Sequence, residues 1–169
     1  HGLLDRESGA GVYDKGVIVD FSMSMVLIAK IMRLLGVDSL HGGAPKGKME
    51  NYNEPMLIQQ ALQNDITPAT DMTLGQNWYG MKGVWHTASG GLHPGTIGES
   101  ITKLGEDLII QAGGGVLGHP WGIEAGVEAM VQARDIAMEK GDLNKWIIEH
   151  PDTALAKAAH YWGFDPKFV

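Results

Sequence analysis

The sequence predicts an α/β fold, the second half of a (β/α)8 TIM barrel followed by closing C-terminal helices. Helical and strand patterns alternate along the chain, and this alternation is typical of a parallel sheet with right-handed crossovers. Each of the three predicted strands ends on glycines, and in a parallel barrel such ends open on one face. Three strands are too few for a closed barrel. A small flavodoxin-like sheet is the alternative, although it would ordinarily have about five strands.

The first predicted elements are a helix, a strand and a helix, over Ser22–Leu35, Val37–His41 and Pro55–Gln63. Apolar side chains recur at helical spacing in the first helix, and Gly36 supplies its end. These side chains share one face of the helix, and Lys30 and Arg33 lie outside that face. The residues of this face are Met23, Leu27, Ile31, Leu34 and Leu35. Asn53 or Glu54 can begin the next helix, because the proline that follows them at position 55 suits a first helical turn.

The middle of the chain is predicted to hold an extended connection, a strand and a helix, over Asp65–Lys82, Val84–Ser89 and Thr96–Leu104. Periodicity in the connection is weak, with a short strand near Asn77–Tyr79. The next strand alternates in polarity and ends on Gly90-Gly91. Thr96 and Glu99 match a capping box at the start of the helix, and Gly105 ends it.

The last predicted elements are a buried strand, a long helix and two closing helices, over Leu108–Ala112, Ile123–Glu139, Leu143–His150 and Asp152–Trp162. The strand ends on the triple glycine Gly113–Gly115. The long helix carries Val127, Met130, Val131 and Ala137, and Gly141 stops it. Pro151 separates the closing helices. No linker or internal repeat divides the chain, so residues 1–169 are expected to form one part of a single domain.

Composition narrows the class of function. The 169 residues are 44% hydrophobic, enough to bury a core, and carry a formal net charge of −7. This charge argues against nucleic acid or an anionic membrane as the main partner, so any anion site must be local. No cysteine is present, which fits a reducing cytoplasm. No uncharged apolar run approaches the roughly 18 residues that span a bilayer.

The segment Leu40–Glu50 can bend sharply and carry a cation over a neighbouring pocket. It contains Gly42, Gly43 and Gly47, with Pro45, Lys46 and Lys48 among them. Glycine permits backbone angles that other residues resist. The alternative is an ordinary exposed loop with solvated lysines, the commonest setting for that residue.

The glycine-rich strand ends indicate a phosphate site. Turns at Gly90-Gly91 and Gly113-Gly114 lead toward helices and expose backbone N–H groups, which favour phosphate. Two such turns on neighbouring strands could hold one phosphate, although each pair alone could simply be a tight turn. His41 could donate to a second phosphate or be a core histidine. Ser89 could contact a substrate hydroxyl or merely end its strand.

Other chemistries lack support in the sequence. The remaining histidines have no close metal-ligand spacing, and no cluster of carboxylates is visible, so no metal ligand is assigned in this chain. Ser89 lacks the Gly-x-Ser-x-Gly pattern of a nucleophile elbow.

Three motifs together resemble the large subunit of ribulose-1,5-bisphosphate carboxylase/oxygenase (RuBisCO). They are His41 with the glycine-rich loop and Gly47-Lys48-Met49-Glu50, then Ala88-Ser89-Gly90-Gly91, then the run from Gly113 to Gly122. They agree in order and spacing, and the resemblance covers essentially the whole chain. The opening His1–Arg6 is similar to the stretch just past the family's His-Arg motif, so the catalytic histidine and a phosphate-binding arginine would lie upstream.

The resemblance implies a role for each predicted site residue. Lys48 would be the mobile-loop lysine that stabilises the carboxylation transition state, and His41 would bind one substrate phosphate. Ser89 would contact a substrate oxygen. The N–H groups of Gly91, Gly113 and Gly114, with Gly90 nearby, would bind the other phosphate. These roles fit the general rule that a positioned cation stabilises negative charge developing in a transition state.

The resemblance also implies partners and a cofactor. The substrates would be ribulose 1,5-bisphosphate with CO2 or O2. The cofactor would be Mg²⁺, held by upstream residues that include a carbamylated lysine. The missing N-terminal half and a second large subunit would complete the site, so the chain alone is expected to be inactive.

The sequence departs from the common family pattern at Gly43-Ala44-Pro45-Lys46 and at Asn51. The neighbourhood of Lys48 resembles the archaeal or form II/III branch more than the plant branch. Two rival functions stay open: a RuBisCO-like enolase or isomerase acting on a related phosphate ester, and a non-catalytic phosphate-binding module. Lys48 speaks against the first, because enolisation alone needs no cation at an incoming CO2.

Overall fold

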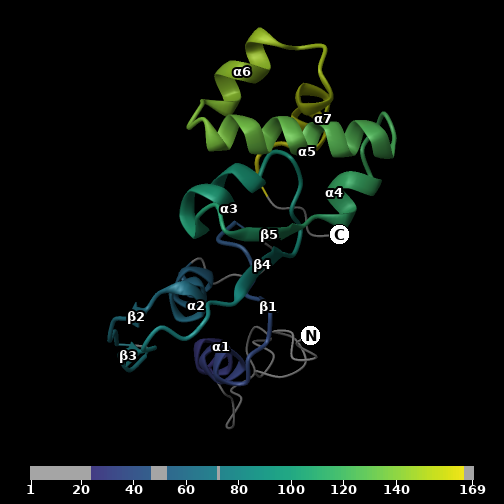
Figure 1. Cartoon of the computed structure of the whole chain (residues 1–169). Helices are drawn as coiled ribbons and strands as arrows, with labels where there is room; N and C mark the ends of the chain where they lie inside the picture. Colours follow the sequence, from purple (N-terminus) through teal and green to yellow (C-terminus); the bar gives the residue numbers. More distant parts are fainter. Residues whose placement is uncertain (1–23, 47–52, 72, 166–169) are drawn as a thin grey trace, which may run out of the picture. The chain divides into compact units, whose positions relative to one another are not determined.

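The computed structural model describes residues 24–46, 53–71 and 73–165. The chain divides into two compact units. Unit 1 comprises residues 1–42 and 53–87, and unit 2 comprises residues 43–52 and 88–169. Figure 1 shows the helices and strands of both units, coloured by their position in the sequence. None of the described helices is both long and apolar enough to cross a membrane.

Among its described residues, unit 1 contains two helices, three short strands and the first part of a fourth. They are α1 Met25–Leu34, β1 Ser39–His41, α2 Glu54–Gln63, β2 Ile66–Thr67, β3 Gln76–Asn77 and β4 Trp85–Ser89. Strand β1 pairs with β4 in parallel, with Leu40 opposite His86 and His41 opposite Thr87. Because α2 lies between these strands in sequence, the parallel pairing confirms the predicted helical crossover. The predicted connection contains an antiparallel β2–β3 pair. Strand β3 overlaps at Asn77 the short strand expected near Asn77–Tyr79.

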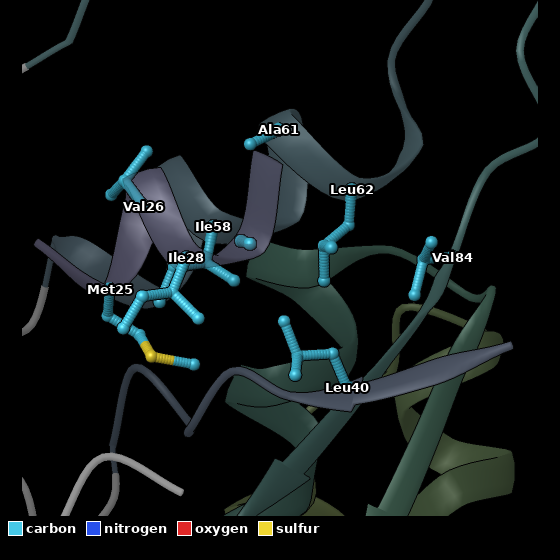
Figure 2. Packing of buried hydrophobic residues seen from close by; sticks show 9 residues of the cluster. Met25, Val26, Ile28, Leu40, Ile58, Ala61, Leu62 and Val84 are labelled. Atoms are coloured by element: carbon cyan, nitrogen blue, oxygen red, sulfur yellow. The ribbon is translucent and has the colours of Figure 1, made fainter. Parts of the chain in front are cut away.

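The core of unit 1 lies where α1 and α2 pack against β1 and Val84, the residue before β4. Figure 2 shows its side chains pointing toward one another from these elements. The fully buried members are Met25, Val26, Ile28, Ala29, Leu40, Ile58, Ala61, Leu62 and Val84. Burial of each large aliphatic side chain contributes about 1.5–3 kcal/mol. This packing fixes β1 and β4, the two strands that end at predicted functional positions.

The prediction of which face of α1 packs in the core is wrong. Its described members Leu27, Ile31, Leu34 and Leu35 are exposed. The opposite face is buried instead, and it includes Lys30 and Arg33, which are only 9% and 2% exposed. This face is buried because Val26, Ile28 and Ala29 meet α2 and β1, and because the two cations find hydrogen-bond acceptors there.

Arg33 is held by four backbone carbonyls. Its guanidinium donates to Ala61 at 3.1 Å, Asn64 at 2.8 Å, Met81 at 2.8 Å and Lys82 at 3.2 Å. The group also lies 4.4 Å from the centre of the Trp78 ring. Burial lowers the pKa of the Arg33 guanidinium, and the carboxylate of Asp65 opposes that shift. Through these bonds one side chain joins α1 to the end of α2 and to the segment before β4.

Unit 2 is mostly helical. Its elements, after the last two residues of β4, are α3 Ile97–Leu104, β5 Leu108–Gln111, α4 Gly113–Leu117, α5 Ile123–Met138, α6 Leu143–Glu149 and α7 Ala154–Trp162. Helix α5 packs against the other helices described in this unit, α3, α4, α6 and α7 (Figure 1). Close approach is possible because its buried residues are mostly small: Gly126, Ala129, Ala133 and Ile136. The side chains of Val127 and Val131, singled out from the sequence, are exposed instead.

Three further predictions for unit 2 are wrong in detail. The capping box is absent, because the hydroxyl of Thr96 bonds to the backbone of His93 instead of capping α3. Strand β5 is only partly buried, since it lies at an end of the β1-β4-β5 order. The triple glycine does not extend the strand end as a loop: it begins the short helix α4. Gly105 does end α3, with φ of 89°.

Candidate anion-binding site

The first glycine-rich turn follows β4 directly. Ser89 is the last residue of that strand and is half-buried. Gly90 and Gly91 follow with φ of 96° and 71°. These are left-handed angles that only glycine adopts without strain, so the chain turns sharply here. The sequence-predicted residues Ser89, Gly90 and Gly91 are thus placed at a strand end, as expected.

The second turn follows β5 and is the start of α4. The first N–H groups of a helix have no partner within it, so those of Gly113 and Gly114 point out of the helix end. Both glycines are exposed, and a Cβ added to either would meet no atom within 4 Å. The backbone at these two residues is therefore open to a ligand.

The two turns adjoin within unit 2. A Cβ added to Gly115 would lie 2.5 Å from the carbonyl oxygen of Leu92 and 2.6 Å from Cα of His93. Gly115 therefore packs directly on the backbone that continues from Gly90-Gly91. This close approach requires glycine, and it brings the N–H groups of Gly113 and Gly114 near the first turn. Residues next to the two turns are therefore in contact, and the shared binding of one phosphate by both turns stays a prediction.

A positive charge also lies in unit 2. The ammonium of Lys46 lies 3.2 Å from a carboxylate oxygen of Asp165 and 3.9 Å from one of Glu99. The first contact links the segment that begins at Gly43 to the end of the described chain, and the second links it to α3. Lys48, the predicted catalytic lysine, lies outside the described residues.

His41 is the last residue of β1, in unit 1, and is half-buried. Its predicted phosphate contact stays a prediction. The next residue, Gly42, donates from its N–H to the carbonyl of Thr87 at 3.1 Å. A Cβ on Gly42 would lie 2.3 Å from Cε1 of the fully buried His86. The strand end of β1 is thus packed tightly against β4.

We expect Gly42→Ala to destabilise unit 1 by about 1–3 kcal/mol, the usual cost of overpacking a full site. The imidazole of His86 cannot retreat easily, because it is fully buried in the core. Chemical denaturation of the full-length protein would measure the loss. Gly83→Ala is the matched control, since a Cβ there would meet its nearest atom at 3.5 Å. Similar losses in both variants would contradict the close contact with His86.

Within the described ranges, no three histidine, aspartate or glutamate side chains gather to hold a metal. Magnesium prefers several oxygen ligands in near-octahedral geometry. The described residues therefore do not fit a Mg²⁺ site. What they do provide is a pair of glycine turns suited to a phosphate group.

Sequence reasoning missed two features of the site. The first is the helical start of α4, which no pattern in a run of three glycines signals. The second is His93, which is 2% exposed and bonds to Asp165, the last described residue. Its position two residues after Gly91 was visible in the sequence, but its partners were not.

The geometry agrees with comparisons to known proteins. The profile of the family described as ribulose bisphosphate carboxylase large chain, catalytic domain, matches residues 6–162. The ribulose bisphosphate carboxylase of Methanocaldococcus jannaschii is 42% identical over 146 residues, covering 85% of this chain and 34% of that protein. The enzyme of Pyrococcus furiosus is 41% identical over 143 residues, covering 84% and 31%. This chain therefore spans about a third of the length of these relatives.

Solved structures give the same result. The dimeric archaeal Rubisco from Hyperthermus butylicus matches with a TM-score of 0.73 and 39% identity, covering 85% of this chain and 33% of that one. An octameric Rubisco from Pyrococcus horikoshii matches with a TM-score of 0.67 and 40% identity, covering 82% and 30%. These matches confirm the predicted α/β barrel class and the likeness to the archaeal branch. The chain belongs to the RuBisCO large-subunit family.

Proposed function

We propose that this chain is part of an enzyme that carboxylates, and oxygenates, ribulose 1,5-bisphosphate. The observation that carries the proposal is the pair of adjoining glycine turns, Gly90-Gly91 and Gly113-Gly114, in a member of this family. Their N–H groups would bind one phosphate of the substrate. The open space at Gly113 and Gly114 leaves room for it.

The other predicted residues take roles around the same substrate. His41 would donate to the second phosphate, and Ser89 would contact a substrate oxygen. The ammonium of Lys48 would stabilise the carboxylate that forms as CO2 adds, since a preorganised cation acts most strongly where charge develops. Because described residues provide no site that fits Mg²⁺, the metal would be held by residues outside them, including a carbamylated lysine.

The partners follow from the relatives. The similar archaeal proteins are named as dimeric in one case and octameric in another. We propose that this chain likewise works in an assembly of large subunits, with a second subunit contributing to each site. No nucleic acid or membrane partner is expected, in view of the net charge of −7. A cytoplasmic location is part of the same proposal.

The test of the phosphate site is Gly114→Val in the full-length enzyme. A Cβ at this position has open space around it, so the fold should be retained, but the valine side chain would shield the N–H groups from an anion. Loss of one hydrogen bond to a charged group costs about 1.5–3 kcal/mol, so KM for the bisphosphate should rise roughly ten- to a hundredfold. Steady-state kinetics and sulfate titration measure the change.

Gly115→Ala is the contrasting variant. Its Cβ would collide with the backbone of Leu92 and His93, so it should lower the melting temperature. Gly114→Val should leave the melting temperature within a few degrees of the parent. If the Gly114 variant binds the bisphosphate as tightly as the parent, the phosphate is not held at this turn.

A further inference from the structure

His93 makes hydrogen bonds with both of its ring nitrogens while almost fully buried. Nδ1 accepts from the N–H of Gly95 at 3.2 Å, and Nε2 lies 2.8 Å from the carbonyl oxygen of Asp165. A carbonyl can only accept, so Nε2 carries the proton and the ring is the neutral tautomer. The backbone of His93 is also fixed, because its N–H and carbonyl both bond to the hydroxyl of Thr96.

The position of His93 connects it to both glycine turns. It follows Gly91 by two residues, and its Cα and Cβ are the surface on which Gly115 packs. Any shift of the His93 backbone would therefore move Gly115, and with it the exposed N–H groups of Gly113 and Gly114. The spacing between the two turns depends on this residue.

The segment after α7 holds His93 from the other side. The ring of Trp162 lies 5.6 Å from the imidazole, centre to centre. The carbonyl of Gly163 approaches Gly95 so closely that a Cβ on Gly95 would lie only 2.3 Å from it. Asp165 accepts from His93 through its backbone and pairs with Lys46 through its carboxylate. Residues 162–165 thus pack against His93 and Gly95, in the segment that follows the turn at Gly90-Gly91.

We propose that His93 is a positioning residue of the anion site, which transmits the placement of residues 162–165 to the two glycine turns. It does not touch the ligand itself: it sets the backbone from which the N–H groups point. The proposal rests on the proposed function, because it assumes that these turns bind the substrate phosphate.

Two variants separate the two ring bonds of His93. His93→Asn places an amide oxygen near the Nδ1 position, so the bond from Gly95 can form while the bond to Asp165 is lost. His93→Gln places an amide nitrogen near the Nε2 position, so the bond to Asp165 can form while the bond from Gly95 is lost. His93→Leu removes both.

His119 offers a matched control in the same unit. It is 4% exposed, its Nδ1 accepts from the N–H of Trp121 at 3.1 Å, and its Nε2 lies 2.9 Å from the carbonyl of Ala154. Its ring also lies 6.0 Å from that of Trp162. The bonding is the same as that of His93, but it joins the end of α4 to the start of α7. His119→Asn should therefore cost stability without a specific effect on anion binding.

The experiment is sulfate titration and bisphosphate kinetics on the full-length enzyme and these four variants, with melting temperatures. We expect His93→Leu to weaken sulfate binding and raise KM about tenfold. His93→Asn and His93→Gln should each weaken sulfate binding and raise KM about threefold, because each retains one of the two ring bonds that His93→Leu removes. In all three, kcat should change less than KM. His119→Asn should lower the melting temperature comparably and leave the sulfate Kd within about twofold.

Two outcomes would overturn the proposal. One is a folded His93→Asn or His93→Gln variant that binds sulfate as the parent does. The other is loss of anion affinity in His119→Asn equal to that in His93→Asn, which would make the effect a consequence of stability alone. Failure of the proposed function is distinct from both, since the parent enzyme itself would then not bind the bisphosphate.

Discussion

Lys48→Met in the full-length enzyme should lower carboxylation roughly 10²–10³-fold, the usual effect of removing one group that stabilises developing charge. In the proposed reaction, proton abstraction from the substrate would precede the addition of CO2 and would not need this ammonium. It should therefore be retained in large part. Fixation of radiolabelled CO2 measures the first step, and exchange of the substrate proton with solvent measures the second.

Lys46→Met is the matched control, two residues earlier. Its ammonium pairs with Glu99 and Asp165, whose side chains are 29% and 86% exposed. Exposed ion pairs of this kind contribute about 0.2–1 kcal/mol, so its loss should change the rate by about fivefold at most. Equal losses in the two variants would contradict the role given to Lys48. Unchanged turnover of a phosphate ester in Lys48→Met would favour the enolase or isomerase function instead.

The order of elements could be predicted because it depends on local patterns. Periodicity and glycine or proline signals place the helices and the main strands within a few residues of their observed bounds. Proximity of the turns at Gly91 and Gly113 also followed, since carboxyl ends of neighbouring parallel strands meet at one edge. These predictions need no knowledge of which side chains touch.

The buried face of α1 could not be predicted in this way. Both of its faces carry apolar residues, and the periodicity favours the stripe through Leu27 and Ile31, which is exposed. The buried face includes Arg33, whose acceptors are 28 to 49 positions away in the sequence. A single sequence gives no sign that four carbonyls will converge on one guanidinium.

The same limit applies to the site. His93 bonds to a carbonyl 72 positions away, and nothing near it in the sequence indicates that partner. Helix α4 begins with three glycines, the residue with the lowest helix propensity after proline, so local preference argues against it. Packing explains one of the three glycines: Gly115 approaches Leu92 and His93 closely, and only glycine allows that contact.

Arg33→Met should reduce the free energy of unfolding of unit 1 by about 3–5 kcal/mol, the usual cost of breaking a buried charged network. Methionine retains the apolar stem but donates no hydrogen bond. It would leave carbonyls of Ala61, Asn64, Met81 and Lys82 without this donor, at about 1–3 kcal/mol for each one that water cannot reach. It would also remove the contact with Trp78.

Lys30→Met separates this network from the general effect of removing a charge from α1. Lys30 donates to the hydroxyl of Thr73 at 2.8 Å and to the carbonyl of Leu74, an exposed residue. Water can replace the lysine at these acceptors, so its loss should cost about 1 kcal/mol, the usual net contribution of a hydrogen bond. Hydrogen exchange of the α1 and α2 amides in the full-length protein reports on unit 1 specifically. Protection should fall far more in Arg33→Met than in Lys30→Met. Equal falls would mean that the four carbonyls find other donors, and that packing of α1 on α2, not the guanidinium, holds the segment before β4 in place.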